Sequence, residues 1–218
     1  MDYFPIFLDL RDKYVLVAGQ YKILEFKIKK MMKAGAKIKF LSDLLPKYLE
    51  KYVKSGKVLF IKDQFREAYL NDVWLVVCGS QDVELKKKIA ETSAARNIFC
   101  NFVDEAPISS FISPSVISKG VITIAISTKG KSPALNKYLK NEIIDAIGDE
   151  YSQFAVILGK MRKKVIKRIP NQKKRRELFD TIVQDKRVQD MIRENKTAEA
   201  EILVGEIIEQ EINRQKQR

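Results

Sequence analysis

Short apolar runs alternate with amphipathic segments along the first half of the chain. The apolar runs have the length and composition of buried strands, and each ends near a glycine or a polar residue. Between them, apolar side chains recur at intervals of three and four residues, as on one face of a helix. The predicted strands span residues 14–18, 37–41, 58–61, 73–78 and 98–103, and the predicted helices span 23–34, 46–55 and 83–97.

This alternation predicts an α/β fold, in which helices cover both faces of an open, Rossmann-like parallel sheet. Such sheets bind ligands at the carboxyl ends of their strands, near the point where the strand order reverses. Gly19, Gly79 and Asp104 each follow the end of a predicted strand. We therefore expect the functional site at this edge of the sheet.

The pattern changes after Pro107. An apolar strand is predicted at 121–127, and Ser132 followed by Pro133 predicts the start of a helix, with the serine as N-cap. From about Tyr151 onward the periodicity is helical throughout. These changes predict a sheet domain at 1–112, a strand-helix segment at 113–150 and an all-helical C-terminal domain at 151–218.

The composition excludes several kinds of site. The 218 residues include no histidine and only two cysteines, Cys78 and Cys100, so neither a histidine-based nucleophile nor a cysteine-histidine metal centre is expected. No apolar run approaches the roughly 20 residues that span a bilayer. The N-terminus lacks the basic start of a secretory signal. We expect a soluble, cytoplasmic protein without a membrane partner.

The net charge of +13 predicts an anionic partner. Residues 160–176 include ten lysines and arginines and no acidic residue. Because no aromatic residue lies between Phe154 and Phe179, stacking of nucleic-acid bases is disfavoured. A solvated helix face and a pocket for a carboxylate-rich ligand remain equally good interpretations.

The sequence Gly130-Lys131-Ser132 is similar to the end of a phosphate-binding P-loop. The glycine that this motif needs five positions before Gly130 is replaced by Ala125. A helix N-terminus capped by Ser132 is the simpler interpretation. Its free backbone N–H groups, with Lys129 and Lys131 beside them, would also attract an anion.

Two positions at the predicted sheet edge are candidates for chemistry. Gly19 opens the turn where a dinucleotide-binding fold has several glycines, although an ordinary turn would explain it equally well. Asp104 would commonly be a turn or capping residue. In a chain without histidine, however, acid-base catalysis must fall to Asp, Glu, Lys, Tyr or Cys, which makes Asp104 the leading candidate.

The order of several motifs resembles a known family. The motifs are PIFLDLR at 5–11, KAGA at 33–36, FCNFVD at 99–104, FISPS at 111–115 and IAISTKGKSP at 124–133. Together they resemble the precorrin-2 dehydrogenase/sirohydrochlorin ferrochelatase module of siroheme synthase, over essentially the whole chain.

The resemblance implies a Rossmann domain, a dimerisation segment that contributes strands to a partner copy, and a C-terminal helical domain. The implied reaction is the NAD-dependent oxidation of precorrin-2 to sirohydrochlorin. In bifunctional members, insertion of ferrous iron follows, and the iron is then a substrate. Lysines and arginines would bind the carboxylates of the tetrapyrrole by charge-assisted hydrogen bonds.

The resemblance also assigns residues. Asp104 corresponds to the family's essential aspartate and would act as a general base. The predicted NAD-binding residues are Gly19, Gln20, Tyr21, Lys22, Ile23, Ser42, Asp43, Leu44, Gly79 and Ser80. The predicted substrate-binding residues are Ser127, Thr128, Lys129, Gly130, Lys131 and Ser132.

One motif departs from the family. Three glycines usually follow the first strand, where this chain has Gly19, Gln20 and Tyr21. The last two side chains would stand where the backbone approaches the pyrophosphate. A chelatase-only member that has lost NAD binding is therefore an alternative, and a nucleic-acid-binding protein based on residues 160–176 is a remote one.

The segment 113–150 predicts a homodimer. Its apolar strand and the following helix, whose apolar face carries Leu135, Leu139, Ile143 and Ile147, cannot bury both apolar surfaces alone. Exchange with a second copy across a two-fold interface would bury them, as the family resemblance also implies.

Overall fold

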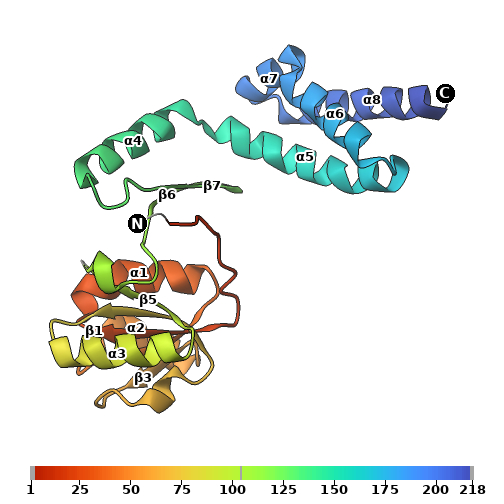
Figure 1. Ribbon diagram of the computed structural model, residues 1–218. Helices are drawn as coiled ribbons and strands as arrows, with labels where there is room; N and C mark the ends of the chain where they lie inside the picture. Colours follow the sequence, from red (N-terminus) through yellow and green to blue (C-terminus); the bar gives the residue numbers. More distant parts are fainter. Residues whose placement is uncertain (1–2, 104, 217–218) are drawn as a thin grey trace. The chain divides into compact units, whose positions relative to one another are not determined.

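The computed structural model describes residues 3–103 and 105–216. The chain divides into two compact units, Met1–Ser113 and Pro114–Arg218 (Figure 1). Among the described residues, none of the helices is long and apolar enough to cross a membrane.

The first unit confirms the predicted α/β class. Its strands are β1 (Tyr14–Gly19), β2 (Lys37–Leu41), β3 (Val58–Ile61), β4 (Val73–Gly79) and β5 (Phe99–Phe102). Its α-helices are α1 (Tyr21–Lys33), α2 (Lys47–Lys54) and α3 (Val83–Ala95), and two 3-10 helices, η1 (Glu67–Leu70) and η2 (Ala106–Ile108), complete it.

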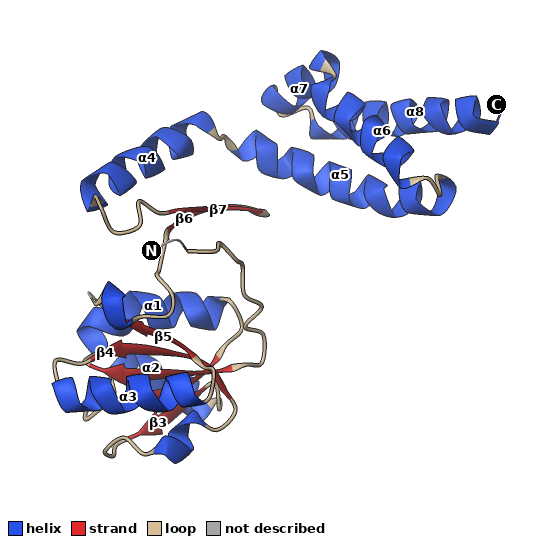
Figure 2. Ribbon diagram, in the orientation of Figure 1, coloured by secondary structure: helices blue, strands red, loops and turns tan. Residues whose placement is uncertain are grey.

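The five strands form a parallel sheet in the order β3-β2-β1-β4-β5, so the strand order reverses between β1 and β4. Successive side chains of a strand point to opposite faces. Val15 and Val17 belong to the core that α1 and α2 cover, whereas Leu16 and Ala18 belong to the core that α3 covers (Figure 2). Burial on both faces explains why β1 is continuously apolar.

The second unit begins with an antiparallel hairpin of β6 (Ser115–Lys119) and β7 (Ile122–Ile126). The sequence pattern predicted β7 alone. The strand β6 has the sequence SVISK, in which only two residues are apolar, and its pairing with β7 makes it a strand.

Among the described residues, five helices follow the hairpin. They are α4 (Pro133–Ala146), α5 (Asp149–Arg168), α6 (Gln172–Gln184), α7 (Lys186–Arg193) and α8 (Thr197–Lys216). The side chains of Asn171 and Asp185 accept hydrogen bonds from the first turns of α6 and α7, so polar caps divide the helical run into separate helices.

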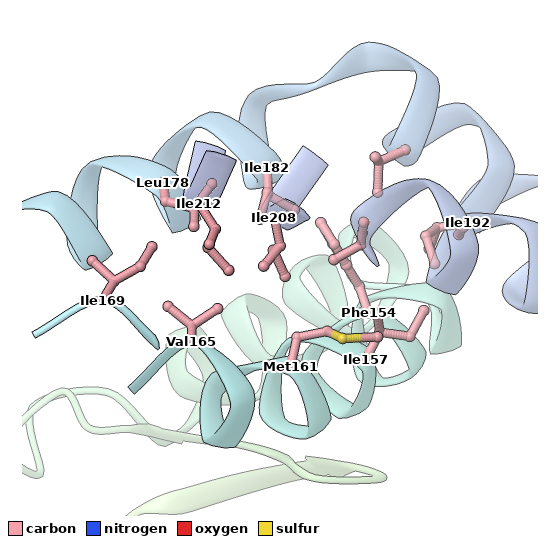
Figure 3. Close-up of a cluster of buried hydrophobic side chains, with 13 residues drawn as sticks. Phe154, Ile157, Met161, Val165, Ile169, Leu178, Ile182, Ile192, Ile208 and Ile212 are labelled. Carbon is pink, nitrogen blue, oxygen red and sulfur yellow. The ribbon is translucent and has the colours of Figure 1, made fainter. Parts of the chain in front are cut away.

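The helices α5 to α8 enclose one apolar core (Figure 3). The core residues of α5 recur at intervals of three and four and those of α8 at intervals of four, as expected for one buried helix face. The core residues are Phe154, Ile157, Met161, Val165, Ile169, Leu178, Ile182, Val188, Ile192, Ala200, Val204, Ile208 and Ile212.

Part of the basic run at 160–176 is neutralised within this unit. Lys160 pairs with Glu201 at 2.9 Å, and Arg168 pairs with Glu209, so α8 supplies acidic partners to α5. The guanidinium of Arg175 donates hydrogen bonds to the carbonyls of Ile169 and Pro170, which directly follow α5. These residues therefore have structural roles besides their contribution to the net charge.

Candidate functional site

The carboxyl ends of β1 and β4 meet where the strand order reverses, and Gly19 and Gly79 are register partners there. Gly19 has a φ of 113°, and a Cβ at this residue would lie 2.6 Å from the carbonyl carbon of Gly79. A Cβ on Gly79 would lie 2.9 Å from Cδ2 of Leu24 in α1. The two glycines therefore allow β1, β4 and α1 to approach one another closely at the carboxyl edge of the sheet.

The helix α1 begins directly after β1 without a side-chain cap. Gln20 occupies the N-cap position with φ −73° and ψ 124°, its side chain makes no capping hydrogen bond, and the first turn contains no acidic residue. Lys22 lies in this turn and is exposed. The N–H groups of a helix start carry partial positive charge, so this end of α1 is electrostatically suited to an anion.

The other predicted cofactor residues lie at the same edge. Ser42, Asp43 and Leu44 follow β2, the neighbour of β1, and the last two are exposed. Ser80 follows β4, and its hydroxyl accepts a hydrogen bond from the N–H of Asp82 at 3.1 Å, which shapes the turn into α3. Tyr21 and Ile23 lie in the first turn of α1.

Asp104, the predicted general base, lies outside the described residues. The residues on either side of it are held at the carboxyl edge of the sheet. The N–H of Val103 donates to the carbonyl of Cys78 at 2.9 Å, and the N–H of Glu105 donates to the carbonyl of Phe102 at 3.2 Å.

Two serine hydroxyls hold the segment that follows against the open edge of β5. Ser109 Oγ accepts from the N–H of Phe102 at 2.9 Å and donates to the carbonyl of Glu105 at 2.8 Å. Ser110 Oγ accepts from the N–H of Cys100 at 2.7 Å. These hydroxyls satisfy backbone groups that an edge strand would otherwise leave unpaired.

A side-chain network fixes the end of this segment to α1. The ammonium of Lys27 donates to Asn101 Oδ1 at 2.7 Å and to Ser113 Oγ at 2.8 Å. The amide of Asn101, a buried residue of β5, donates to the carbonyl of Phe111 at 3.0 Å. Phe111 and Ser113 of the FISPS motif are therefore anchored to β5 and α1.

Lys86 and Glu105 form an ion pair that the sequence analysis missed. Lys86 lies in α3 and is only 9% exposed, on the same buried face as Ile89 and Ser93. The intervals of three and four between these residues place the lysine on the apolar face of the predicted helix, and a charged residue there indicates a partner of opposite charge.

The two cysteines are free and buried. Burial raises the pKa of the Cys78 thiol, which keeps it in the protonated, unreactive form near neutral pH. Within residues 3–103 and 105–216, no group of three His, Cys, Asp or Glu side chains could hold a metal ion.

The predicted substrate loop lies in the second unit, which is described by itself. Ser127 Oγ accepts from the N–H of Lys129 at 3.0 Å, and Thr128 Oγ1 donates to the carbonyl of Ser132 at 3.1 Å. Ser132 Oγ accepts from the N–H of Leu135 at 3.1 Å and so caps α4, as predicted. Lys129 and Gly130 have positive φ values of 54° and 80°, and Lys131 is exposed beside the helix start.

Comparison with known families matches both units. A family described as a putative NAD(P)-binding domain matches residues 6–115, and the sirohaem synthase dimerisation region matches residues 150–208. The first unit is thus a Rossmann-like domain of the NAD(P)-binding class.

Curated relatives give the particular family. Siroheme synthase of Sodalis glossinidius is 33% identical over 180 residues, which cover 83% of this chain and 38% of that protein. Siroheme synthase of Baumannia cicadellinicola is 32% identical over 183 residues, which cover 84% and 40%. The chain belongs to the precorrin-2 dehydrogenase/sirohydrochlorin ferrochelatase family represented in siroheme synthases. It spans about two fifths of the length of these relatives.

A solved structure shares the fold. SirC, a precorrin-2 dehydrogenase, superimposes with a TM-score of 0.75 over 94% of this chain and 100% of that chain, at 22% sequence identity. The likeness supports the sheet unit followed by a mainly helical unit, as predicted from the sequence.

Proposed function

We propose that this protein oxidises precorrin-2 to sirohydrochlorin, with NAD as the hydride acceptor. The family membership and the names of the related proteins support this reaction. The observation that carries the proposal is the close approach of Gly19 and Gly79 beside the uncapped start of α1. A Cβ at Gly19 would fill the space between the two strand ends, where a dinucleotide fold brings its backbone to the pyrophosphate.

The residue types at the edge fit NAD. The backbone N–H groups of the first turn of α1 would bind the pyrophosphate, and Asp43 after β2 would bind ribose hydroxyls. Gln20 replaces a family glycine, but its φ of −73° is an ordinary conformation for any residue. Its exposed side chain can point to solvent, and its N–H donates to the carbonyl of Gly79, so the substitution leaves the N–H groups of the first turn of α1 available for a pyrophosphate.

Asp104 would act as the general base. Oxidation removes a hydride and a proton from the macrocycle, and bound NAD supplies the acceptor for the hydride. The carboxylate of Asp104 would take the proton. The anchored residues on either side of Asp104 support this role, because a base must be held within hydrogen-bond reach of the proton it removes.

Anaerobic turnover of precorrin-2 with and without NAD tests the proposal. We expect sirohydrochlorin to form only with NAD, and Asp104→Asn to lower kcat by about 100-fold or more while far-UV circular dichroism is unchanged. Titration of NAD by calorimetry should give binding heat. No heat, together with insertion of ferrous iron into sirohydrochlorin, would instead identify a chelatase-only protein and refute the dehydrogenase.

Two glycine variants test the cofactor site directly. Gly19→Ala places a Cβ against the backbone of β4 and should abolish NAD binding. Gly159→Ala is the matched control, because a Cβ at Gly159 meets no atom within 4 Å and the residue lies in α5. If Gly19→Ala and the wild type bind NAD with equal affinity, the strand-end glycines are not part of the NAD-binding site.

We infer that the substrate contacts the second unit at the start of α4. Lys131 is exposed there, and the first turn of α4 contains no acidic residue. A carboxylate of the tetrapyrrole would be stabilised by the helix start and by the ammonium. Lys131→Met should raise KM for precorrin-2 with little change in KM for NAD.

A second copy of the chain would cover the apolar surfaces that the second unit leaves exposed. None of the residues of α4 is buried within the single chain, and Leu135 and Tyr138 are 48% and 59% exposed. The hairpin has only two strands, which are marginal in water without further packing. Pairing of these apolar surfaces across a two-fold axis would bury them, in keeping with the match to a dimerisation region.

Sedimentation equilibrium checks the assembly. A homodimer has twice the 25.2 kDa mass of the chain. An active monomer at micromolar concentration would refute the exchange of these surfaces.

A further inference from the structure

The amino-terminal edge of the parallel sheet contains a cavity to which the proposed function assigns no role. Its volume is about 300 Å³, at the lower end of the range of small-molecule sites. The segment before β1, the start of β4 and the connection from α3 into β5 line it. The lining residues are Leu8, Leu10, Val73, Trp74, Leu75, Arg96, Asn97, Ile98 and Phe99. Because a dinucleotide binds at the opposite, carboxyl edge of such a sheet, this cavity lies apart from the proposed cofactor site.

An irregularity in β4 places Trp74 at this cavity. The first two residues of β1 pair with Val73 and Leu75, so Trp74 between them has no register partner in β1. Bulges of this kind re-aim a side chain and are common next to functional sites. The indole is 49% exposed, although the rest of β4 is buried. The register shift therefore brings a large aromatic surface to the cavity wall.

Apolar side chains from three separate segments stay exposed around the cavity. Leu8 before β1 is 40% exposed, and Phe99, the first residue of β5, is 46% exposed. Together with Trp74 they line one cavity. Contiguous apolar surface on a soluble domain is a mark of binding sites, because covering it removes apolar area from water. The apolar body of a ligand would gain this free energy.

The charges at the cavity favour an anionic group on the ligand. None of the nine lining residues is acidic, and Arg96 is the charged residue among them. Nη1 of Arg96 donates to the carbonyl of Glu67 and to Oδ1 of Asn71, both at 3.1 Å, whereas Nη2 makes only a long contact of 3.4 Å with the exposed Glu67 carboxylate. Nη2 is therefore the weakly held donor. The ammonium of Lys13 adds a second positive charge, 4.2 Å from the centroid of the Trp74 ring.

We propose that this cavity binds a small amphipathic anion, with an aromatic or branched aliphatic body and one carboxylate. The body packs against Trp74 and Phe99, and the carboxylate accepts a charge-assisted hydrogen bond from Arg96. The positive charges of Arg96 and Lys13 disfavour a cationic ligand of the same shape. The proposal does not rest on the proposed function, because the site uses neither the cofactor edge nor the substrate loop.

Naphthoate is the probe, and the full chain labelled with fluorotryptophan is the sample. Trp74 is the single tryptophan, so one fluorine NMR resonance reports on the cavity. Naphthylmethanol and naphthylmethylammonium present the same ring system without charge and with a positive charge. We expect naphthoate to shift the resonance saturably with a Kd below about 1 mM. The alcohol should bind roughly 10-fold more weakly, and the ammonium more weakly still.

Variants separate the apolar wall from the charge. Leu8→Ala and Phe99→Ala should each weaken naphthoate binding by about 5-fold or more, because they remove apolar contact area. Leu59→Ala is the matched control, since Leu59 is 53% exposed but lies in β3, at the other end of the sheet, and should bind naphthoate as the wild type does. Arg96→Met should abolish the preference for naphthoate over the alcohol, and Arg96→Lys should retain part of it. Far-UV circular dichroism checks that each variant is folded.

The results that would overturn the proposal need no variant. A resonance that stays in place up to about 10 mM naphthoate, or equal affinity of the wild type for naphthoate and the alcohol, refutes it. Saturating NAD should leave the Kd for naphthoate unchanged, and displacement of naphthoate by NAD would place the probe at the carboxyl edge instead. If dilution of the protein moves the resonance and naphthoate does not, a second copy of the chain covers the cavity and the ligand site is refuted. Because binding of the probe needs no turnover, these outcomes leave the oxidation of precorrin-2 to its own test.

Discussion

Gly79→Ala tests whether the contact between β4 and α1 sets the geometry of the sheet edge. The added Cβ would lie 2.9 Å from both Cδ2 and Cγ of Leu24, and 3.3 Å from Cδ1. Leu24 is fully buried in the core beneath α1, so its side chain cannot swing into solvent. Either Leu24 leaves its rotamer or α1 moves away from the sheet. We expect the free energy of unfolding to fall by about 1–3 kcal/mol.

Because a methyl group at position 79 and the side chain of Leu24 compete for the same space, we expect the effects of substituting the two residues on the free energy of unfolding to be non-additive. Leu24→Ala alone leaves a cavity and should cost about 2–5 kcal/mol. In the double variant, the methyl group at position 79 enters the space that Leu24 vacates. The combined cost should therefore be smaller than the sum of the single costs by about 1 kcal/mol or more.

Urea unfolding followed by tryptophan fluorescence measures these values. The chain has a single tryptophan, Trp74 in β4, so this signal reports on the first unit. The control Gly159→Ala lies in the second unit and should leave the Trp74 transition unchanged. Circular dichroism should show a small stabilisation of the helices by this control, of about 0.5–1 kcal/mol. A wild-type midpoint for Gly79→Ala, or strictly additive costs in the double variant, would refute the reasoning.

Three further variants test local features. Ser132→Ala removes the cap of α4 and should cost about 1 kcal/mol in urea unfolding followed by circular dichroism. Ser109→Ala leaves the N–H of Phe102 without its hydroxyl partner and should cost about 1–3 kcal/mol in the Trp74-monitored transition. Hydrogen bonds from Arg187 lower the pKa of Asp185. The ionised Asp185 therefore stabilises the folded state fully above about pH 4, and this stabilisation is lost as the pH falls through the lowered pKa. The stability difference between the wild type and Asp185→Asn should therefore shrink in acid, and a constant difference down to about pH 2 would contradict this.

The local pattern of apolar and polar residues was sufficient to predict most of the helices and strands of the first unit. The central strands β1 and β4 are continuously apolar because both of their faces are buried, and that signal is contained within a few consecutive residues. Gly19 at the end of β1 and the cap at Ser132 are local signals of the same kind. The family motifs placed the candidate cofactor and substrate residues on these elements, although the roles of those residues stay predictions.

The remaining features depend on residues that are distant in sequence. The strand β6 was not predicted, because its short and half-polar sequence becomes a strand only through pairing with β7. Lys160 and Arg168 belong to a run that contains no acidic residue, but folding brings α8 and its glutamates beside them. The apolar periodicity of a strand (2 residues) or of a helix (3.6 residues) carries no information about which residues distant in sequence pair with one another.

The sequence by itself determined which segments are strands and helices and which of their ends could bind a ligand, because these follow from the spacing of apolar residues and from turn chemistry. Only the tertiary structure decided which ends meet. Gly79 matters because the strand order places β4 beside β1 and α1 above it. Lys86 matters because the same packing brings the buried face of α3 to the segment after β5. Both contacts arise from the crossover connections of a parallel sheet, which join positions that no local pattern relates.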